Sequence, residues 1–271
     1  MLKRLLFFFI FSTSFVSAQI DYSDSWEDFF SYNNVKDFVK VDNMLYALSD
    51  NAIFTYDDTT QEIEKLSSVQ GLSGETTSAI HYSIETNRLV IGYENGLIEV
   101  VDSDGSITIS ADIVSFNQTG EKSINDIFEY QGKLYLSTSF AIVEYDITEL
   151  EFGDTFFIGN NSTDVNIHQI TVFNDRIFAA TEDGIFYADS ANPNLIDFNN
   201  WNTITSANNN FKNITVFNNK LYTILNTQLY EVNEMNELEF IKDFFLTVSD
   251  LKGSSTNLLV AFDSSVIVYD T

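Results

Sequence analysis

The fold is decided by the stretch Lys133-Leu134-Tyr135-Leu136-Ser137-Thr138, which is followed three residues later by Ile142-Val143-Glu144-Tyr145. Both runs are rich in aliphatic, β-branched and aromatic residues and have no useful helical period, so they predict β-strands. The polar pair Gln131-Gly132 stands just before the first run. Glycine tolerates the positive φ of a tight turn, so this pair predicts the tip of a hairpin.

The same pattern recurs along the whole chain. An apolar residue equivalent to Leu134 stands at Leu45, Leu89, Leu134, Ile177, Leu221 and Leu258, in steps of 37 to 45 residues. Eight residues after each lies a second apolar residue, at Ile53, Leu97, Ile142, Ile185, Leu229 and Val266. A polar turn pair precedes each first position, at Asp42-Asn43, Thr86-Asn87, Gln131-Gly132, Asn174-Asp175, Asn218-Asn219 and Ser255-Thr256.

A period of this length is typical of β-propeller blades. Each unit is interpreted as strand, tight turn, strand, short turn, strand, and then a more variable fourth strand. A β-solenoid would share the period, but the strand pattern excludes helical repeats. The sequence therefore predicts an all-β protein with six visible four-stranded blades.

The two ends of the chain suggest how the ring closes. The segment Trp26-Glu27-Asp28-Phe29-Phe30 precedes Leu45 much as Trp201-Asn202-Thr203-Ile204 precedes Leu221, and Trp201 is expected in the fourth strand of a blade. Residues 266–270 match the third strand of a blade. We therefore expect the N-terminal segment to be the fourth strand of the last blade, which would leave no unpaired sheet edge. The alternative is a longer chain with further blades.

The N-terminus has the features of an export signal. Lys3 and Arg4 precede an apolar run too short to span a bilayer comfortably, and small residues lead to Ala18. This pattern predicts a signal peptide over residues 1–18 that is cut before Gln19, and a propeller domain over residues 19–271. A retained membrane anchor is the alternative. No later run is apolar enough to span a membrane, and the absence of cysteine excludes disulfides and an N-terminal lipid-modified cysteine.

The chain is strongly acidic, with a formal net charge of -27. Such a surface repels nucleic acid phosphates and anionic membranes unless cations intervene. Nucleic acid is therefore not expected as a partner. The acidity by itself names no partner, since it also suits a simple, strongly hydrated surface.

A polar position recurs eight residues before each apolar marker. It is occupied by Asp37, His81, Asp126, Gln169, Asn213 and Asp250. An apolar residue follows each of them, so alternation along the first strand would turn the polar set toward the central channel. One hypothesis is a site for a cation or a polar ligand. The other is a water-filled channel in which any polar residue suffices.

Other chemistry is weakly supported. His81 and His168 are the two histidines, and no serine can be placed beside either from the sequence, so a hydrolytic triad has no support. The segment Asp102-Ser103-Asp104-Gly105 begins like a calcium loop but lacks its third ligand and distal glutamate, and is interpreted as a connecting turn. No cofactor, metal site or catalytic residue is expected.

Three segments resemble a known family: residues 26–35, residues 66–73 and residues 91–98, which read Ile91-Gly92-Tyr93-Glu94-Asn95-Gly96-Leu97-Ile98. Together they resemble the N-terminal propellers of the PorZ family, components of the bacterial type IX secretion system. The likeness covers essentially the whole chain after residue 18. The Gly71-Leu72-Ser73 element is also shared with propellers of hybrid two-component sensors.

The resemblance implies a non-catalytic subunit at the cell surface or outer membrane, or otherwise in the periplasm. It also implies partners: other subunits of the attachment complex, and anionic lipopolysaccharide delivered to a sortase subunit. The family continues into a second propeller and a β-sandwich that are not found before Thr271. Two other hypotheses are an extracellular sensor propeller and a glycan-cleaving enzyme with Asp37 and Asp126 as acid and base.

Overall fold

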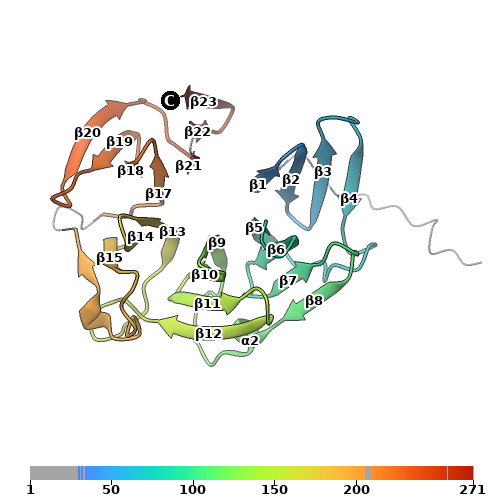
Figure 1. The fold of residues 1–271 in the computed structure, drawn as a ribbon, viewed down its shortest axis with the longest axis horizontal. Coiled ribbons are helices and arrows are strands. Elements are labelled where there is room, and N and C mark those ends of the chain that lie inside the picture. The colour runs from blue at the N-terminus through green and yellow to red at the C-terminus, as the bar shows by residue number, and fades with distance from the viewer. Residues whose placement is uncertain (1–29, 31, 33, 205–208, 255, 271) are drawn as a thin grey trace, which may run out of the picture.

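The computed structural model describes residues 30, 32, 34–204, 209–254 and 256–270. These residues form six antiparallel sheets arranged around a central axis as the blades of a propeller (Figure 1). Helical structure is limited to the short helix α2 (Asp112–Ser115) and the 3₁₀ turn η3 (Phe198–Asn200) within the described residues. The predicted all-β propeller is thus confirmed.

Each blade follows chain order from the channel outward. The first three blades consist of β1 (Asp37–Val41), β2 (Met44–Ser49), β3 (Ala52–Asp57) and β4 (Ile63–Leu66); β5 (Thr77–Ser83), β6 (Arg88–Tyr93), β7 (Ile98–Val101) and β8 (Ile107–Ser110); and β9 (Ile124–Tyr130), β10 (Lys133–Thr138), β11 (Ile142–Asp146) and β12 (Glu151–Phe156).

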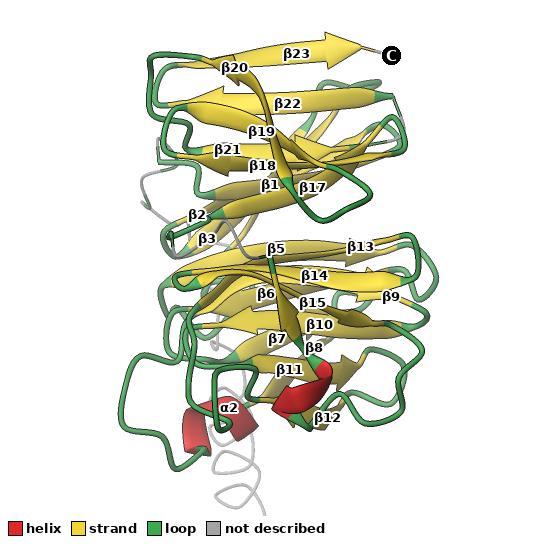
Figure 2. Ribbon diagram, turned by 90° about the vertical axis from the view of Figure 1, so that its left-hand side faces the viewer, coloured by secondary structure: helices red, strands yellow, loops and turns green. Residues whose placement is uncertain are grey.

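The other three blades continue the same order. They consist of β13 (Ile167–Phe173), β14 (Arg176–Thr181), β15 (Gly184–Asp189) and β16 (Asn202–Thr203); β17 (Asn213–Phe217), β18 (Lys220–Leu225), β19 (Gln228–Val232) and β20 (Leu238–Asp243); and β21 (Asp250–Gly253), β22 (Asn257–Phe262) and β23 (Ser265–Asp270). The sixth blade thus has three strands in the described part of the chain, and β23 is its outer edge (Figure 2).

The expected repeat positions occupy equivalent places. Every residue of the first apolar set lies in the second strand of a blade, and the second set lies at or next to the start of the third strand. Five of the expected hairpin tips have positive φ at their polar residues, including 54° at Asn87 and 58° at Asp175. Asn and Asp tolerate this conformation with little strain. The prediction that these residues form tight hairpin turns is therefore confirmed for these tips.

Five apolar clusters stabilise the ring, and each lies between two successive blades. Leu48 and Ile53 of the first blade pack with Ile80 and Leu89 of the second, for example. The junction between the sixth and first blades has no such cluster among the described residues. Cohesion therefore comes from packing between blades, as expected for a chain without disulfides.

Some predictions fall outside the described residues. The signal peptide and the closing segment Trp26–Phe29 are not described, and Phe30 is described but not in a strand. In the predicted repeat, this closing segment corresponds to residues 201–204. There Trp201 leads directly into β16, which is the fourth strand of its blade. None of the described helices is long and apolar enough to cross a membrane.

Candidate functional site

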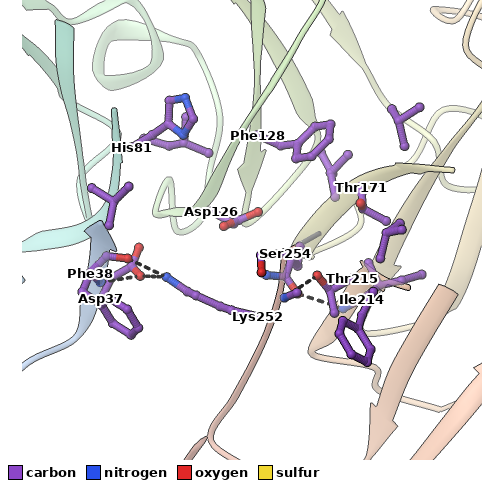
Figure 3. Close-up of a pocket in the computed structure, with 18 of the residues that line it drawn as sticks. Asp37, Phe38, His81, Asp126, Phe128, Thr171, Ile214, Thr215, Lys252 and Ser254 are labelled. Atoms are coloured by element: carbon purple, nitrogen blue, oxygen red, sulfur yellow. Dashed lines mark hydrogen bonds and ion pairs between the residues drawn. The ribbon is translucent and has the colours of Figure 1, made fainter. Parts of the chain in front are cut away.

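The central channel is lined by the innermost strands β1, β5, β9, β13, β17 and β21 (Figure 1). It contains a wide cavity of about 810 Å³ and a narrower one of about 280 Å³. Asp37, Asp126, Gln169 and Lys252 line both cavities. The two cavities therefore meet at a polar constriction, and this constriction is the candidate site (Figure 3).

All six residues of the recurring polar position line one or both cavities. Five of them also occupy the same place in their sheet, opposite the residue three positions after the apolar marker. These pairs are Asp37 with Leu48, Asp126 with Ser137, Gln169 with Ala180, Asn213 with Ile224, and Asp250 with Ala261. Equal spacing in sequence therefore gives equal height in the channel for these five.

His81 is the exception. It pairs with Val90, whereas Ala79 lies opposite Gly92 and so holds the place that the other five residues occupy. The reason is the turn between β5 and β6, which spans residues 84–87 and is longer than the two-residue turn of the first blade. His81 therefore lines the wide cavity but lies two residues farther along its strand than the place that the other five residues hold.

His81 instead joins two blades. Its Nε2 lies 2.8 Å from Oε2 of Glu129 in the third blade, and Ser83 Oγ donates to Oε1 of the same carboxylate at 2.9 Å. The hydrogen bond from His81 lowers the pKa of Glu129 despite partial burial. Because the carboxylate lies between the hydroxyl and the imidazole, His81 cannot take the proton of Ser83 as a catalytic triad requires.

Side chains at the recurring polar position form hydrogen bonds with the backbone of the next blade. The innermost strands are sheet edges, so some of their N–H groups point into the channel without a ladder partner. Asp37 Oδ2 accepts from the Ile80 N–H of the second blade at 3.2 Å, and Gln169 Oε1 accepts from the Ile214 N–H of the fifth at 2.8 Å. Asp126 likewise accepts from the Ile170 N–H. These side chains connect one blade to the next.

Lys252 is a site residue that the sequence reasoning missed. It reaches across the channel from β21 to Asp37 of β1, with which it forms an ion pair, and donates to the Phe38 carbonyl at 3.0 Å (Figure 3). Its ammonium also lies 4.8 Å from the centre of the Phe38 ring. Lys252 follows Asp250 by two positions, so strand alternation could have placed it in the channel.

The constriction combines three carboxylates with one ammonium. Burial, together with repulsion from Asp37, raises the pKa of Asp126 to about 7. Burial also raises the pKa of Asp250. Burial acts to lower the pKa of Lys252, but the nearby carboxylates outweigh it and raise that pKa. The cluster thus exchanges a proton near neutral pH and keeps Lys252 charged.

Two further polar groups face the narrow cavity. His168 lines it, and burial lowers the pKa of this imidazole, which favours the neutral form. The amide Nδ2 of Asn213 donates to Asp250 Oδ1 at 3.0 Å. No group of three or more His, Asp or Glu residues in the described chain is arranged to hold a metal ion. The geometry supports polar contacts with a ligand or water.

The suspected calcium-like loop is a connecting turn between β7 and β8, as predicted. Asp102 Oδ1 accepts from Arg88 Nε at 2.7 Å, and Asp104 Oδ1 accepts from the Ser106 N–H at 2.9 Å. Both carboxylates therefore serve the local structure. Neither belongs to a group of three or more His, Asp or Glu residues that could hold a metal ion in the described part of the chain.

Comparisons with known proteins agree with this architecture. The model of a family described as the TSS9, PorZ, N-terminal beta-propeller domain matches residues 45–202. The structure of PorZ, described as an essential surface component of the type IX secretion system of Porphyromonas gingivalis, superimposes with a TM-score of 0.71 at 17% identity. The superposition covers 91% of this chain, and this chain spans only 34% of the PorZ chain.

Other solved propellers are also similar. The extracellular domain of a putative hybrid two-component system from B. thetaiotaomicron superimposes with a TM-score of 0.67 at 16% identity, covering 90% of this chain and 34% of its own. BamB from Moraxella catarrhalis reaches 0.56 at 11% identity, with 85% and 67% covered. No curated protein sequence matches. At these identities the superpositions show the fold alone.

Proposed function

Because the chain belongs to the family of PorZ N-terminal β-propeller domains, we propose that it serves as a binding and scaffold module of a type IX secretion system. The match over residues 45–202, more than half of the chain, is the observation that carries this proposal. The channel geometry supports a non-catalytic role, since its polar side chains are engaged in holding blades together. The chain would act by presenting surfaces.

The proposed partners are other subunits of the attachment complex at the cell surface, together with anionic lipopolysaccharide. The net charge of -27 bears on the second partner. Like charges repel, so a direct contact with phosphate or carboxylate groups needs divalent cations between them. We expect any lipopolysaccharide binding by this domain to require calcium or magnesium and to be lost in EDTA.

A genetic experiment tests the scaffold role. The gene that encodes the chain is deleted from its strain, and the amount of cargo anchored at the surface is measured. Loss of anchored cargo, restored by the intact gene, is expected. Unchanged anchoring would refute the secretion role. A complemented strain that carries the triple change Asp37→Asn, Asp126→Asn and Asp250→Asn then asks whether the channel carboxylates contribute beyond the fold.

Export is tested separately. Residues 1–18 are proposed to be a signal peptide, so the mature protein should begin at Gln19 and be found outside the inner membrane. N-terminal sequencing of the protein from cell fractions decides this. A chain that retains Met1 in the inner membrane would indicate an anchor instead.

The second candidate function is ligand sensing outside the cell. The similarity to the extracellular domain of a putative two-component system favours it. It predicts a membrane span and kinase domains in the same gene beyond the codon for Thr271. A second propeller and a β-sandwich there would favour the secretion role.

A further inference from the structure

Another pocket, of about 480 Å³, lies at the end of the channel where the innermost strands begin. Every described residue that lines it is polar or charged, and none belongs to the recurring polar position. The rim pocket, as we call it, is lined among others by Lys36, Ser78, Glu94, Glu121, Asn125 and Ser139. A ligand would therefore be held there by hydrogen bonds and charge rather than by apolar contact.

Two hydroxyls of the rim pocket have no hydrogen-bond partner. Ser78 Oγ and Ser139 Oγ are buried, and neither forms a hydrogen bond within the described part of the chain. A buried polar atom that lacks a partner costs free energy, and such atoms are few in folded proteins. Because both serines line the rim pocket, a group bound in it would supply the missing hydrogen bonds.

The rim pocket continues into the narrow cavity of the channel, because Lys36, Ser78 and Asn125 line both. Asn213 and His168 line the narrow cavity, and Asn213 Oδ1 and His168 Nε2 are also buried without a partner. Asn213 is only 7% exposed. Four of the six unpartnered buried side-chain atoms in the described residues thus belong to residues around this continuous space.

Lys36 shows how an ammonium group is held at the rim. Its Nζ donates to Thr77 O at 2.9 Å and to Glu94 Oε1 at 3.1 Å, and it forms an ion pair with Asp50 Oδ1 at 3.4 Å. An ammonium has three N–H donors, and these contacts occupy them. Two carboxylates also balance its single charge, so Lys36 offers little to an anionic ligand.

The remaining groups of the rim pocket are mainly acceptors. Asn125 Nδ2 donates to Asn166 Oδ1 at 2.9 Å and to Ile167 O at 2.6 Å, which uses both amide hydrogens and leaves Asn125 Oδ1 as an acceptor. Glu121 is exposed and has no hydrogen bond or ion pair among the described residues. Since acceptors and negative charge are in excess, the pocket favours a cationic ligand that is rich in hydrogen-bond donors.

We propose that the rim pocket binds a primary ammonium group. Such a group carries one positive charge and three N–H donors. The unpartnered hydroxyls of Ser78 and Ser139 and the carboxylate of Glu121 supply the acceptors. The net charge of -27 attracts cations to the protein as a whole, and the rim pocket gives one of them a defined place. This inference goes beyond the proposed role in secretion and does not depend on it.

Calorimetric titration of the purified protein with 1,5-diaminopentane at pH 7.5 and low salt tests the proposal. We expect saturable binding with a dissociation constant of about 1 mM or lower. The control ligand is 1,5-pentanediol, which has hydroxyls in place of the ammonium groups and should bind at least about tenfold more weakly. Equal binding of the diol, or no binding of the diamine, would overturn the proposal. Tighter binding of calcium than of the diamine would overturn it as well.

The double variant Ser78→Ala, Ser139→Ala removes the two unpartnered hydroxyls. Its melting temperature should not fall, because no internal hydrogen bond is lost, whereas its affinity for the diamine should fall about tenfold. The matched control is Ser137→Ala. The Ser137 hydroxyl is also buried and unpartnered, but Ser137 lines neither the rim pocket nor the narrow cavity, so the affinity should not change. An equal effect on affinity in the two variants would contradict the proposal.

A charge variant separates the pocket from the overall field of the protein. Glu121→Gln should weaken binding of the diamine about three- to fivefold, since an exposed carboxylate contributes modestly. Glu85→Gln removes the same charge from the exposed turn between β5 and β6 and should leave the affinity unchanged. Equal weakening by both substitutions would show that only the net charge attracts the diamine, and the proposal would fail.

Two sources supply the same ammonium group, namely a free amine and a lysine side chain of a partner protein. Nα-acetyl-lysine N-methylamide carries the lysine ammonium alone. Binding of this compound as tight as that of the diamine supports a lysine of a partner. Binding at least about tenfold weaker supports a free diamine, whose second ammonium is drawn to the carboxylates of the channel. If neither compound binds, the rim pocket is not an ammonium site.

Discussion

Replacing Asp126 by Asn is expected to remove a pH dependence from the stability of the propeller. Asp126 lies at the channel constriction with Asp37, Asp250 and Lys252, and its pKa is raised from 3.8 to about 7. In the unfolded chain the carboxyl ionises near its ordinary value. Between these two values the folded state binds more protons than the unfolded state, so the free energy of unfolding falls as pH rises.

The magnitude follows from the two pKa values. Each pH unit in this window costs about 1.4 kcal/mol for one titrating group. From pH 5, where the unfolded carboxyl is already ionised, to pH 7, where Asp126 is half ionised in the fold, the loss is about 2 kcal/mol. An asparagine keeps a similar shape and does not titrate. The variant should therefore lose about 2 kcal/mol less than the native chain over this window.

Urea unfolding, followed by tryptophan fluorescence at pH 5, 6, 7 and 8, measures this difference. The control is Asp104→Asn, because a backbone hydrogen bond from Ser106 lowers the pKa of the exposed Asp104 and keeps it ionised at all four pH values. Its curve should run parallel to that of the native chain. If the Asp126→Asn curve is also parallel, Asp126 is already ionised at pH 5 and the reasoning fails.

Two further substitutions test the junctions between blades. Lys252→Met leaves the half-buried carboxylate of Asp37 without its cation and should lower the free energy of unfolding by about 1–3 kcal/mol at pH 8 in urea unfolding, with a smaller loss at pH 5; an unchanged midpoint at pH 8 would contradict the assigned ion pair. Gly92→Ala places a Cβ 2.8 Å from Ile124 Cγ2 of the next blade and should cost about 1–3 kcal/mol. Adding Ile124→Val should recover part of that loss, and no recovery would show that the strain lies elsewhere.

The fold was predictable because its signals are local. The six apolar pairs and the polar turns before them repeat at the level of single hairpins, and each hairpin forms largely from its own residues. Five of the hairpin tips have their positive φ values at the expected Asn, Asp, Gln or Gly residues, such as Asp42 and Gly132. The strand order followed from the rule that consecutive strands pair.

The channel was less predictable, because side-chain placement depends on where residues are inserted. Counting back eight residues from Leu89 gave His81, but the turn over residues 84–87 adds length and moves His81 away from the common ring position. Counting back a fixed eight residues assumes that the turn between the first and second strands has the same length in every blade. Lys252 was missed for another reason: its role depends on Asp37, far away in sequence, and no spacing rule connects the two.

The polarity of the ring can be explained without a ligand. Ile80, Ile170 and Ile214 are apolar residues of inner strands whose N–H groups face the channel side, where no strand pairs with them. An N–H buried without an acceptor costs about as much as a lost hydrogen bond. A carboxylate or amide on the preceding blade supplies that acceptor, so selection for folding alone keeps this position polar in blade after blade.

The same reasoning separates the channel residues that serve as hydrogen-bond partners within the fold from the charge that this role does not explain. One acceptor for each inner strand accounts for Asp37 and Gln169, and Asn213 and Asp250 satisfy each other in part. Lys252 cancels one of three carboxylates and leaves the constriction negative once Asp126 ionises. If the channel does bind anything, the excess charge favours a cation or a donor-rich neutral group, and it disfavours the anionic part of a lipopolysaccharide. The anionic partner is therefore better sought on surfaces outside the channel.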